Sequence, residues 1–321
     1  MNRIPAIKNQ HGLTLVEVMI SITISLILLA GILQIFVGTK QTYRVQEAIS
    51  RIQENGRFAM DFLARNARMA DFWGCNRDMS NFNNLLNPVS AGYIDFMGGG
   101  VDGTDNTGLN GSDTLIIRGA IGSGIMVETP YMNTNAANIK VNANNGLQQN
   151  DVVAISDCKM GDIFQITNAN PNTSGTVVHN TGTGSIGNAT KNLSTVYQGD
   201  AQIYIARQYS YQIAAGNSGE PALFRSTNGV NEELVDGIEN MQIIYGEDTD
   251  GDGSANYYVS AGSVVDMNNV VSVRISLMVR NPDDKITDAG RTYSYMGNTF
   301  SAPDQRLRKI FTTTITIRNR V

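Results

Sequence analysis

The hydrophobic pattern of the chain opens with one long apolar segment. Residues 18–37 are twenty residues in succession without a charged side chain, and about twenty apolar residues can cross the hydrocarbon core of a bilayer as a helix. Beyond this segment the pattern becomes amphipathic, with small and apolar residues at spacings of three and four as far as Ala70. Because no proline lies between Pro5 and Pro88, the pattern predicts one continuous helix over residues 13–70, apolar on all sides at first and on one face later.

Farther along the chain the apolar positions recur with a period of two. Residues 271–279 and 311–317 alternate apolar with polar side chains, which is typical of antiparallel strands with one buried face. Short β-rich runs occupy residues 114–118, 152–155 and 163–167, and a longer strand rich in Ile and Tyr is predicted over residues 203–213. Residues 168–200 are rich in Asn, Thr and Gly, so they are predicted to form a polar surface excursion with at most a hairpin.

Composition and charge place the body of the protein outside the cytoplasm. Only 17% of the residues are charged, and the 32 glycines and abundant asparagines suit a loop-rich β domain. Arg3 and Lys8 precede the apolar segment and no basic cluster directly follows it, which predicts a cytoplasmic N-terminus and a head across the membrane. Removing these two residues takes the formal net charge from −5 to −7, and an acidic body argues against direct nucleic-acid binding.

A glycine stands at the start of the apolar part of the chain. Gly12 is followed by Leu13 and, at the fifth place, by Glu17. A secretory signal is cut after its apolar region, whereas a cut after Gly12 leaves the apolar helix on the mature chain. This arrangement resembles the leader of type IV prepilins, whose peptidase cleaves there and methylates the new N-terminal residue, here Leu13. The alternative is an uncleaved signal anchor whose acid reaches the membrane interface.

Glu17 is the one acid in this membrane segment. A carboxylate in such a place is costly and usually has a partner. The free amine of a cleaved Leu13 lies one helical turn before Glu17, and the same amine on a neighbouring subunit could neutralise the carboxylate when helices bundle. Glu17 is therefore predicted to act in assembly.

The helix and the strands together predict an α+β fold. The one-sided half of the helix needs an apolar surface, so it is expected to pack on an antiparallel β-sheet head, which strands after Cys75 enlarge. The predicted domains are a leader at residues 1–12, a stem helix at 13–70 whose residues 13–37 cross the membrane, and a β-rich head at 71–321.

The chain has two cysteines, Cys75 and Cys158. In an exported protein such a pair predicts one intramolecular disulfide. In the chain-entropy account the closed loop is worth about 4–5 kcal/mol. The alternatives are two buried free thiols and an intermolecular bridge.

A resemblance to one family extends over nearly the whole chain. It is carried by blocks at residues 53–59, 68–75, 155–158, 163–167, 234–241 and 271–279. The most specific block ends in Trp73-Gly74-Cys75 and has a later Asp157-Cys158 partner. These blocks are similar to the PilW family of minor pilins, which are type IV pilin-like. The resemblance implies a structural, non-enzymatic subunit that waits in the inner membrane through residues 13–37, with its head in the periplasm, and then joins the cell-surface pilus.

The same resemblance implies the partners and the process. The partners are the prepilin peptidase, other minor pilins, the major pilin and a large tip adhesin. The protein would prime pilus assembly and sit in the tip complex, in support of twitching motility, adhesion or DNA uptake. Two alternatives stay open at this point. One is a type II secretion pseudopilin, which shares the leader and the stem, and the other is a membrane-anchored enzyme or calcium-dependent binding protein.

Catalytic signatures are sparse in the sequence. The two histidines are His11, in the leader, and His179, which is expected to be a solvated loop residue. Gly98-Gly99-Gly100 does not follow a strand and open a helix as a phosphate loop does, so it is predicted to be a flexible turn. No Ser/His/Asp, Cys/His or Walker arrangement is recognised.

One segment, residues 248–256, carries a metal signal. Asp248, Asp250 and Asp252 stand at alternate positions before Gly253. Calcium loops of the EF-hand type need oxygen ligands at these places and a glycine at the sixth. The segment is therefore a candidate calcium site, and no other cofactor is indicated.

The second half of this loop departs from the EF-hand pattern. Ser254, through its carbonyl, and Asn256, through an oxygen or a water, are the further candidate ligands. The twelfth place holds Val259 where EF-hands have a bidentate glutamate, so Glu247 or Asp266 is a candidate for the missing ligand. The alternative is an acidic turn between two strands.

Overall fold

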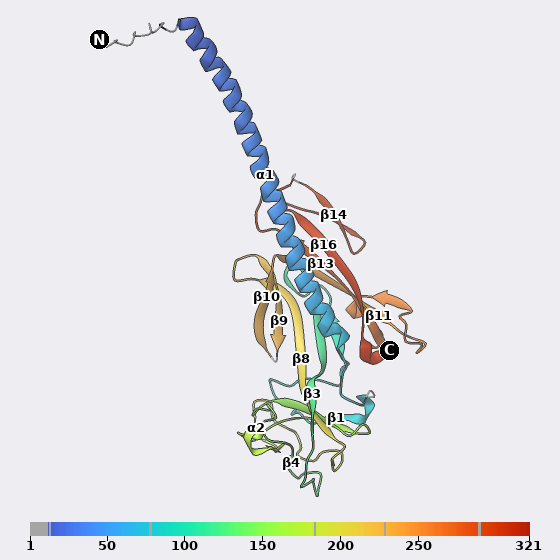
Figure 1. Cartoon of the computed structure of the whole chain (residues 1–321). Coiled ribbons are helices and arrows are strands. Elements are labelled where there is room, and N and C mark those ends of the chain that lie inside the picture. The colour runs from blue at the N-terminus through green and yellow to red at the C-terminus, as the bar shows by residue number, and fades with distance from the viewer. Residues whose placement is uncertain (1–11, 13, 77–78, 183, 228, 288–289) are drawn as a thin grey trace, which may run out of the picture. The chain divides into compact units, whose positions relative to one another are not determined.

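A computed structural model describes residues 12, 14–76, 79–182, 184–227, 229–287 and 290–321. The chain forms two compact units, Met1–Ser50 and Arg51–Val321. Helix α1, Leu15–Arg68, continues from the first unit into the second and is the long blue helix of Figure 1. The prediction of one uninterrupted N-terminal helix is confirmed over these residues.

The described secondary structure of the first unit is the N-terminal part of α1. Residues 14–43 are exposed, and an 18-residue window of the helix has a mean hydropathy of 2.5. By length and composition this is a helix that can cross a membrane. Ser21, Thr23 and Ser25 do not interrupt it, because each hydroxyl donates to the carbonyl four residues before it.

In the second unit, the last part of α1 turns one face to the core. Ala59, Leu63 and Ala67 are fully buried there, three to four residues apart. Gly56 lies on the same face against the ring of Phe311, and a Cβ at this position would overlap the ring. Glycine therefore lets the helix approach the sheet closely at this point.

The sheet beside this glycine has four antiparallel strands. In spatial order they are β12 (Tyr257–Val259), β11 (Ile238–Glu247), β13 (Val270–Arg280) and β16 (Arg308–Thr316). β13 pairs with β16 without a register shift from Ser272 opposite Thr316 to Arg280 opposite Arg308. The strands predicted from the alternation at residues 271–279 and 311–317 are therefore confirmed, and the structure shows that they pair with each other.

A second, mixed sheet has eight strands. Its main path is β1 (Phe82–Asn84), β6 (Gly161–Gln165), β5 (Val152–Ser156), β8 (Gln202–Ala215), β3 (Thr114–Met126) and β2 (Val101–Thr104), and β9 (Pro221–Thr227) and β10 (Val230–Asp236) extend from β8. β1 and β6 are parallel, whereas the other pairs are antiparallel. The runs predicted as strands at residues 114–118, 152–155, 163–167 and 203–213 each contribute a strand to this sheet.

Two small two-stranded sheets and several short helices complete the head. The pairs are β4 (Ile139–Lys140) with β7 (Thr176–Val177), and β14 (Thr292–Tyr295) with β15 (Asn298–Ser301). The short helices are α2 (Pro171–Ser174), η1 (Met79–Asn81), η2 (Leu109–Gly111), η3 (Ala261–Ser263), η4 (Met267–Asn269) and η5 (Arg318–Arg320).

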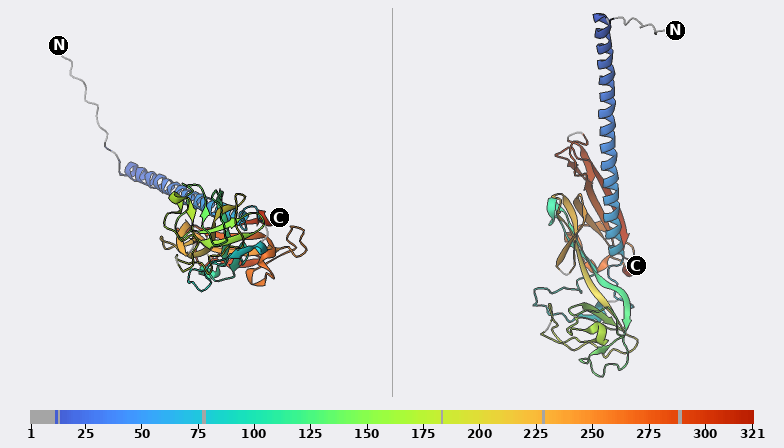
Figure 2. Two further views of the ribbon diagram at one scale, coloured as in Figure 1. Left: turned by 90° about the horizontal axis from the view of Figure 1, so that it is seen from below. Right: turned by 60° about the vertical axis from the view of Figure 1, so that its left-hand side comes forward.

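Two long strands connect the parts of the head. β3 and β8 run from the region of α1 into a lobe formed by the middle of the chain, as the green and yellow strands of Figure 2 show. Leu115 and Tyr211 pack with the buried face of α1 and with both sheets. Farther along the same strands, Ala120 and Ile203 belong to the clusters of that lobe. One pair of strands thus serves separate hydrophobic cores.

Residues 168–200 differ from their prediction as a polar surface excursion. Val177, Leu193 and Tyr197 are buried in the lobe core. Asparagine side chains take over the pairing that strands would otherwise supply: Asn168 donates to the Thr176 carbonyl at 2.8 Å and accepts from the Val178 amide at 3.1 Å. The high Asn content therefore satisfies buried backbone groups instead of marking a solvated loop.

Candidate functional site

The start of α1 is closed by a reciprocal capping arrangement. Thr14 is the residue before the helix, and its hydroxyl accepts from the Glu17 amide at 3.3 Å. The Glu17 Oε2 accepts in return from the Thr14 amide at 2.9 Å and from the Thr14 hydroxyl at 3.0 Å. This is a capping box, which satisfies amides that a helix start leaves unpaired. A Thr followed three residues later by Glu is a sequence signal for this capping box.

The predicted cleavage site adjoins this cap. Gly12 is exposed, and Leu13, the predicted first mature residue and methylation site, lies outside the described residues. Cleavage after Gly12 would leave Thr14 and Glu17 on the mature chain with the cap intact. The predicted roles of Gly12, Leu13 and Glu17 stay predictions.

Beyond the cap, the helix presents an apolar surface to its surroundings. The exposed large side chains include Leu15, Met19, Ile20, Ile27, Leu28, Ile32, Ile35 and Phe36. Leaving such a surface in water is unfavourable by roughly 25 cal/mol for each Å². The surface therefore requires a lipid environment or the apolar faces of other helices.

The two cysteines form the predicted disulfide. The Cα atoms of Cys75 and Cys158 are 5.1 Å apart. Cys75 follows α1 closely, and Cys158 lies in the turn between β5 and β6. Nearby, Trp73 is buried and its Nε1 donates to Asp71 Oδ1 at 3.0 Å. The bond and the indole together anchor the chain segment after α1 in the lobe.

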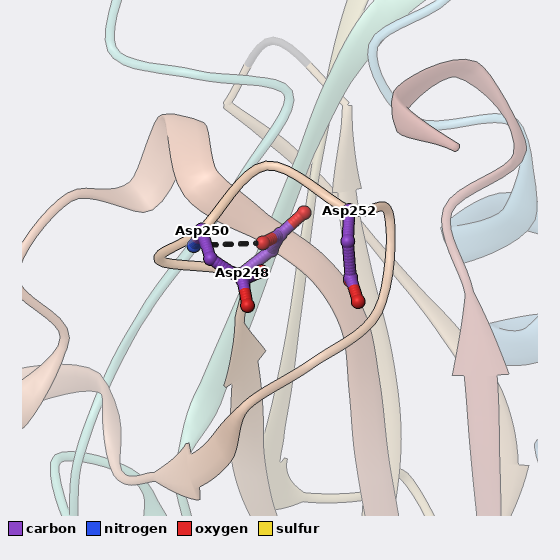
Figure 3. A group of neighbouring side chains, drawn as sticks. All are labelled: Asp248, Asp250 and Asp252. Atoms are coloured by element: carbon purple, nitrogen blue, oxygen red, sulfur yellow. Dashed lines mark hydrogen bonds between the residues drawn. The ribbon is translucent and has the colours of Figure 1, made fainter.

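The three aspartates of the metal signal come together in the loop between β11 and β12 (Figure 3). Asp248 is buried, whereas Asp250 and Asp252 are exposed. One carboxylate oxygen from each lies within 4.8 Å of the others. This exposed group of oxygens has the chemistry to hold a metal ion, as oxygen ligands suit hard divalent cations.

Backbone amides set the orientation of Asp248. Its Oδ2 accepts from the Gly253 amide at 2.8 Å, and its Oδ1 accepts from the Gly251 amide at 2.7 Å. These bonds lower the pKa of Asp248, the Gly253 amide foremost. The carboxylate is therefore ionised and held in one position at neutral pH. Gly251 and Gly253 both have positive φ, 75° and 85°, which glycine adopts without strain.

The other candidate ligands make hydrogen bonds in or near the loop, and their roles as ligands stay predictions. Asn256 Oδ1 accepts from the Thr249 amide at 2.7 Å, and the Ser254 amide donates to Asp252 Oδ1 at 2.7 Å. Glu247 has both carboxylate oxygens in hydrogen bonds with other groups, and Asp266 accepts from Asn268 at the start of η4. Among the described His, Cys, Asp and Glu residues, the three aspartates are the group whose ligand atoms come together.

His179 is buried rather than solvated, which corrects its prediction. Only 2% of its surface is exposed, its Nε2 lies 3.0 Å from the Ala137 carbonyl, and its ring is 5.2 Å from that of Phe164. Burial lowers its pKa, so the imidazole is neutral.

The predicted turn at residues 98–100 is held by Arg118, whose Nη1 donates to the carbonyls of the first two glycines.

Two comparisons with protein families agree with these features. Residues 210–319 match the family described as Type IV Pilus-assembly protein W, and residues 7–33 match the Prokaryotic N-terminal methylation motif. No curated protein and no solved structure gives a match. The first match covers the four-stranded sheet and the second covers the helix start with Gly12 and Glu17. Over residues 210–319 the chain is therefore similar to the PilW family of type IV pilus-assembly proteins, and over residues 7–33 it carries an N-terminal methylation motif.

Proposed function

We propose that this protein is a structural minor pilin that primes type IV pilus assembly and lies in the tip complex. The observation that carries the proposal is the exposed apolar surface of α1 in a chain that also matches the PilW family. Such a helix can wait in the inner membrane, with the head in the periplasm, and then move into a bundle of pilin helices. Prepilin peptidase would cut after Gly12 and methylate Leu13.

The hydrogen bonds of Glu17 support a role in that bundle. Both bonds to Thr14 use Oε2, and Oε1 has no hydrogen bond within the described part of the chain. Oε1 can accept a hydrogen bond from the N-terminal amine of a neighbouring subunit without breaking the cap. A carboxylate left unpaired in hydrocarbon is costly, so the pairing would favour the assembled state over the isolated subunit.

Two substitutions of Glu17 separate the charge from the cap. Glu17→Gln removes the charge, and glutamine keeps the side-chain geometry of a capping box. Glu17→Ala removes both. If charge pairing drives assembly, both variants should be cleaved and inserted normally, yet both should be depleted from sheared pili at least tenfold. Immunoblots of membranes and sheared pili measure this, and Gly12→Asp is the control that should stay at precursor length.

The outcomes distinguish the proposed roles. Native levels of Glu17→Gln in pili, with loss of Glu17→Ala alone, would show that the cap matters and the charge does not. Mass spectrometry of proteins that copurify with the wild type should find other minor pilins, the major pilin and a tip adhesin. Copurification with a secretion system in place of pili would overturn the pilus role. The same strains, tested for twitching, adhesion and DNA uptake, reveal which process the pilus serves.

We further propose that the aspartate loop binds calcium weakly. The observation in favour is that Asp248 is already ionised and oriented by Gly251 and Gly253, so little ordering is left for the ion to impose. Three carboxylates without a bidentate glutamate suit the weak range of extracellular sites, with a Kd of about 0.1–1 mM. Asp250 is exposed and lies within the group.

The melting temperature of the full chain tests the calcium site. At a tenfold excess over the Kd, calcium should stabilise the fold by about 1.4 kcal/mol. Asp250→Asn keeps the shape of the side chain and should abolish this gain, whereas Asp200→Asn, an exposed acid outside the loop, should keep it. An unchanged melting temperature of the wild type across 0–10 mM calcium, on the order of ten times such a Kd, would exclude the site.

A further inference from the structure

A pocket of about 570 Å³ lies in the head, and the described residues that line it include no member of the aspartate loop. β11 and β13 contribute Gln242 and Met278, the η2 turn contributes Asn110, and the β14–β15 hairpin contributes Met296 and Phe300. Small-molecule sites in proteins typically occupy about 300–1,000 Å³. Four separate segments of the second unit thus meet around a space large enough for a ligand.

Part of the pocket lining consists of carboxamides that hydrogen bonds hold in place. Gln242 Nε2 donates to the Gly111 carbonyl at 2.8 Å and to Asn240 Oδ1 at 3.2 Å. Asn240 Nδ2 donates to the Asn110 carbonyl at 2.8 Å, and the Tyr295 hydroxyl donates to Asn240 Oδ1 at 2.9 Å. These bonds leave Gln242 Oε1 and Asn110 Oδ1 without a hydrogen bond in the described part of the chain. The pocket therefore presents oriented polar groups that are still able to bind.

The β14–β15 hairpin adds Met296 and Phe300 to the lining, together with the polar Thr299 and Ser301, and Met296 breaks a local rule. Met296 and Gly297 form the two-residue turn between β14 and β15, with φ of +49° and +79°. A turn with both φ positive favours Asn-Gly or Gly-Gly, because a long side chain is disfavoured in this conformation. The turn alone does not account for methionine at position 296. Met296 instead lines the pocket, as do Phe300 and Met278.

The pocket has no free charge. Among the described residues that line it, Glu239 is the one with a side chain that is charged at neutral pH. Its carboxylate accepts from Arg308 at 3.0 Å and from Arg280 at 3.3 Å, so its charge is neutralised within the head. A phosphate, a carboxylate or an ammonium group would find no counter-charge here and would lose its hydration without compensation.

We propose that this pocket binds a neutral saccharide. A sugar ring carries hydroxyls at its edge, which can both donate to and accept from the carboxamides, and an apolar C–H face, which suits Phe300 and Met296. A lining that combines neutral carboxamides with an aromatic ring and methionines satisfies both parts of such a ligand at once. The site would give the protein a direct contact with glycans, independent of its role in assembly.

Binding to immobilised sugars tests the proposal on the full chain. The protein is purified in a zwitterionic detergent, because maltoside detergents carry a disaccharide that would compete. It is then applied to neutral glucose-, galactose- and N-acetylglucosamine-containing oligosaccharides, with sialylated and phosphorylated sugars alongside. At least one neutral series should be retained, and the free form of that sugar should compete and give a saturation-transfer NMR signal.

Two substitutions locate the binding, and a third controls for them. Met296→Asn suits the turn, so it should keep or raise the melting temperature while weakening binding at least tenfold. Gln242→Leu should weaken binding to a similar extent by removing a carboxamide. Val89→Asn replaces an apolar side chain that is 88% exposed elsewhere in the head and should leave binding unchanged.

Three results would overturn the saccharide site. They are no retention on any neutral series, retention confined to charged sugars, and retention that both pocket variants preserve. Because the readout is binding by the isolated chain, its failure leaves the pilus role untouched. Conversely, Met296→Asn should enter pili at the native level, since assembly does not depend on this pocket.

Discussion

Removing the Cys75–Cys158 disulfide should destabilise the head by several kcal/mol. The bond joins residues separated by 83 positions, and a loop of this length corresponds to about 4–5 kcal/mol of lost chain entropy in the unfolded state. The perturbation is the double variant of Cys75→Ser with Cys158→Ser, which removes the bond without leaving a free thiol. The cost should appear in the head, because both cysteines lie in the second unit.

Trp73 makes the measurement local. It is the single tryptophan of the chain, it is 2% exposed, and it stands two residues before Cys75. Urea unfolding followed by its fluorescence should shift to a midpoint lower by about 1.3–2.5 M, for a slope of roughly 2–3 kcal/mol per molar. The shift should be accompanied by little change in slope if the same surface is exposed on unfolding.

The wild type treated with a reductant is the matched control. It lacks the same cross-link, so its midpoint should coincide with that of the double variant. If both midpoints equal that of the oxidised wild type, the bond does not constrain the unfolded chain as argued. If only the double variant shifts, the serine substitutions themselves disturb the lobe and the entropy argument is refuted for this bond.

Three further changes test the packing and the charges of the head. Leu63→Ala should lower the free energy of unfolding by about 2–5 kcal/mol, because the side chain is fully buried between α1 and the sheets. Urea unfolding measures this loss, and a loss under about 0.5 kcal/mol would contradict the burial. Gly56→Ala should lower the melting temperature although alanine favours helix, because the added methyl overlaps Phe311. A hydrogen bond from Arg308 holds the pKa of Asp304 below its usual value. The stability that this bond contributes is therefore present above about pH 4 and is lost as the pH falls through the folded pKa. Asp304→Asn should flatten the acid side of the profile of unfolding free energy against pH.

Much of the fold could be predicted from the sequence because periodicity carries it. The spacing of Ala59, Leu63 and Ala67 indicates a helix face, and the alternation along β13 and β16 indicates strands with one buried side. The disulfide could be predicted because Cys75 and Cys158 are the only cysteines. These signals are local or involve a single pair, so no knowledge of the three-dimensional arrangement is needed to read them.

The parts that could not be predicted depend on side chains that replace backbone pairing or meet from distant segments. Asn168 holds β7 in place with its carboxamide, and Asn188 accepts from the Gln165 amide at 2.8 Å and donates to its carbonyl at 2.9 Å. In a sequence these asparagines look the same as asparagines in a solvated loop, because composition does not distinguish a carboxamide bonded to water from one bonded to a buried peptide group. The proposed saccharide pocket could not be predicted for a related reason. Its carboxamides come from η2 and β11, which are separated by more than a hundred residues, and only the register of the folded sheets brings them together.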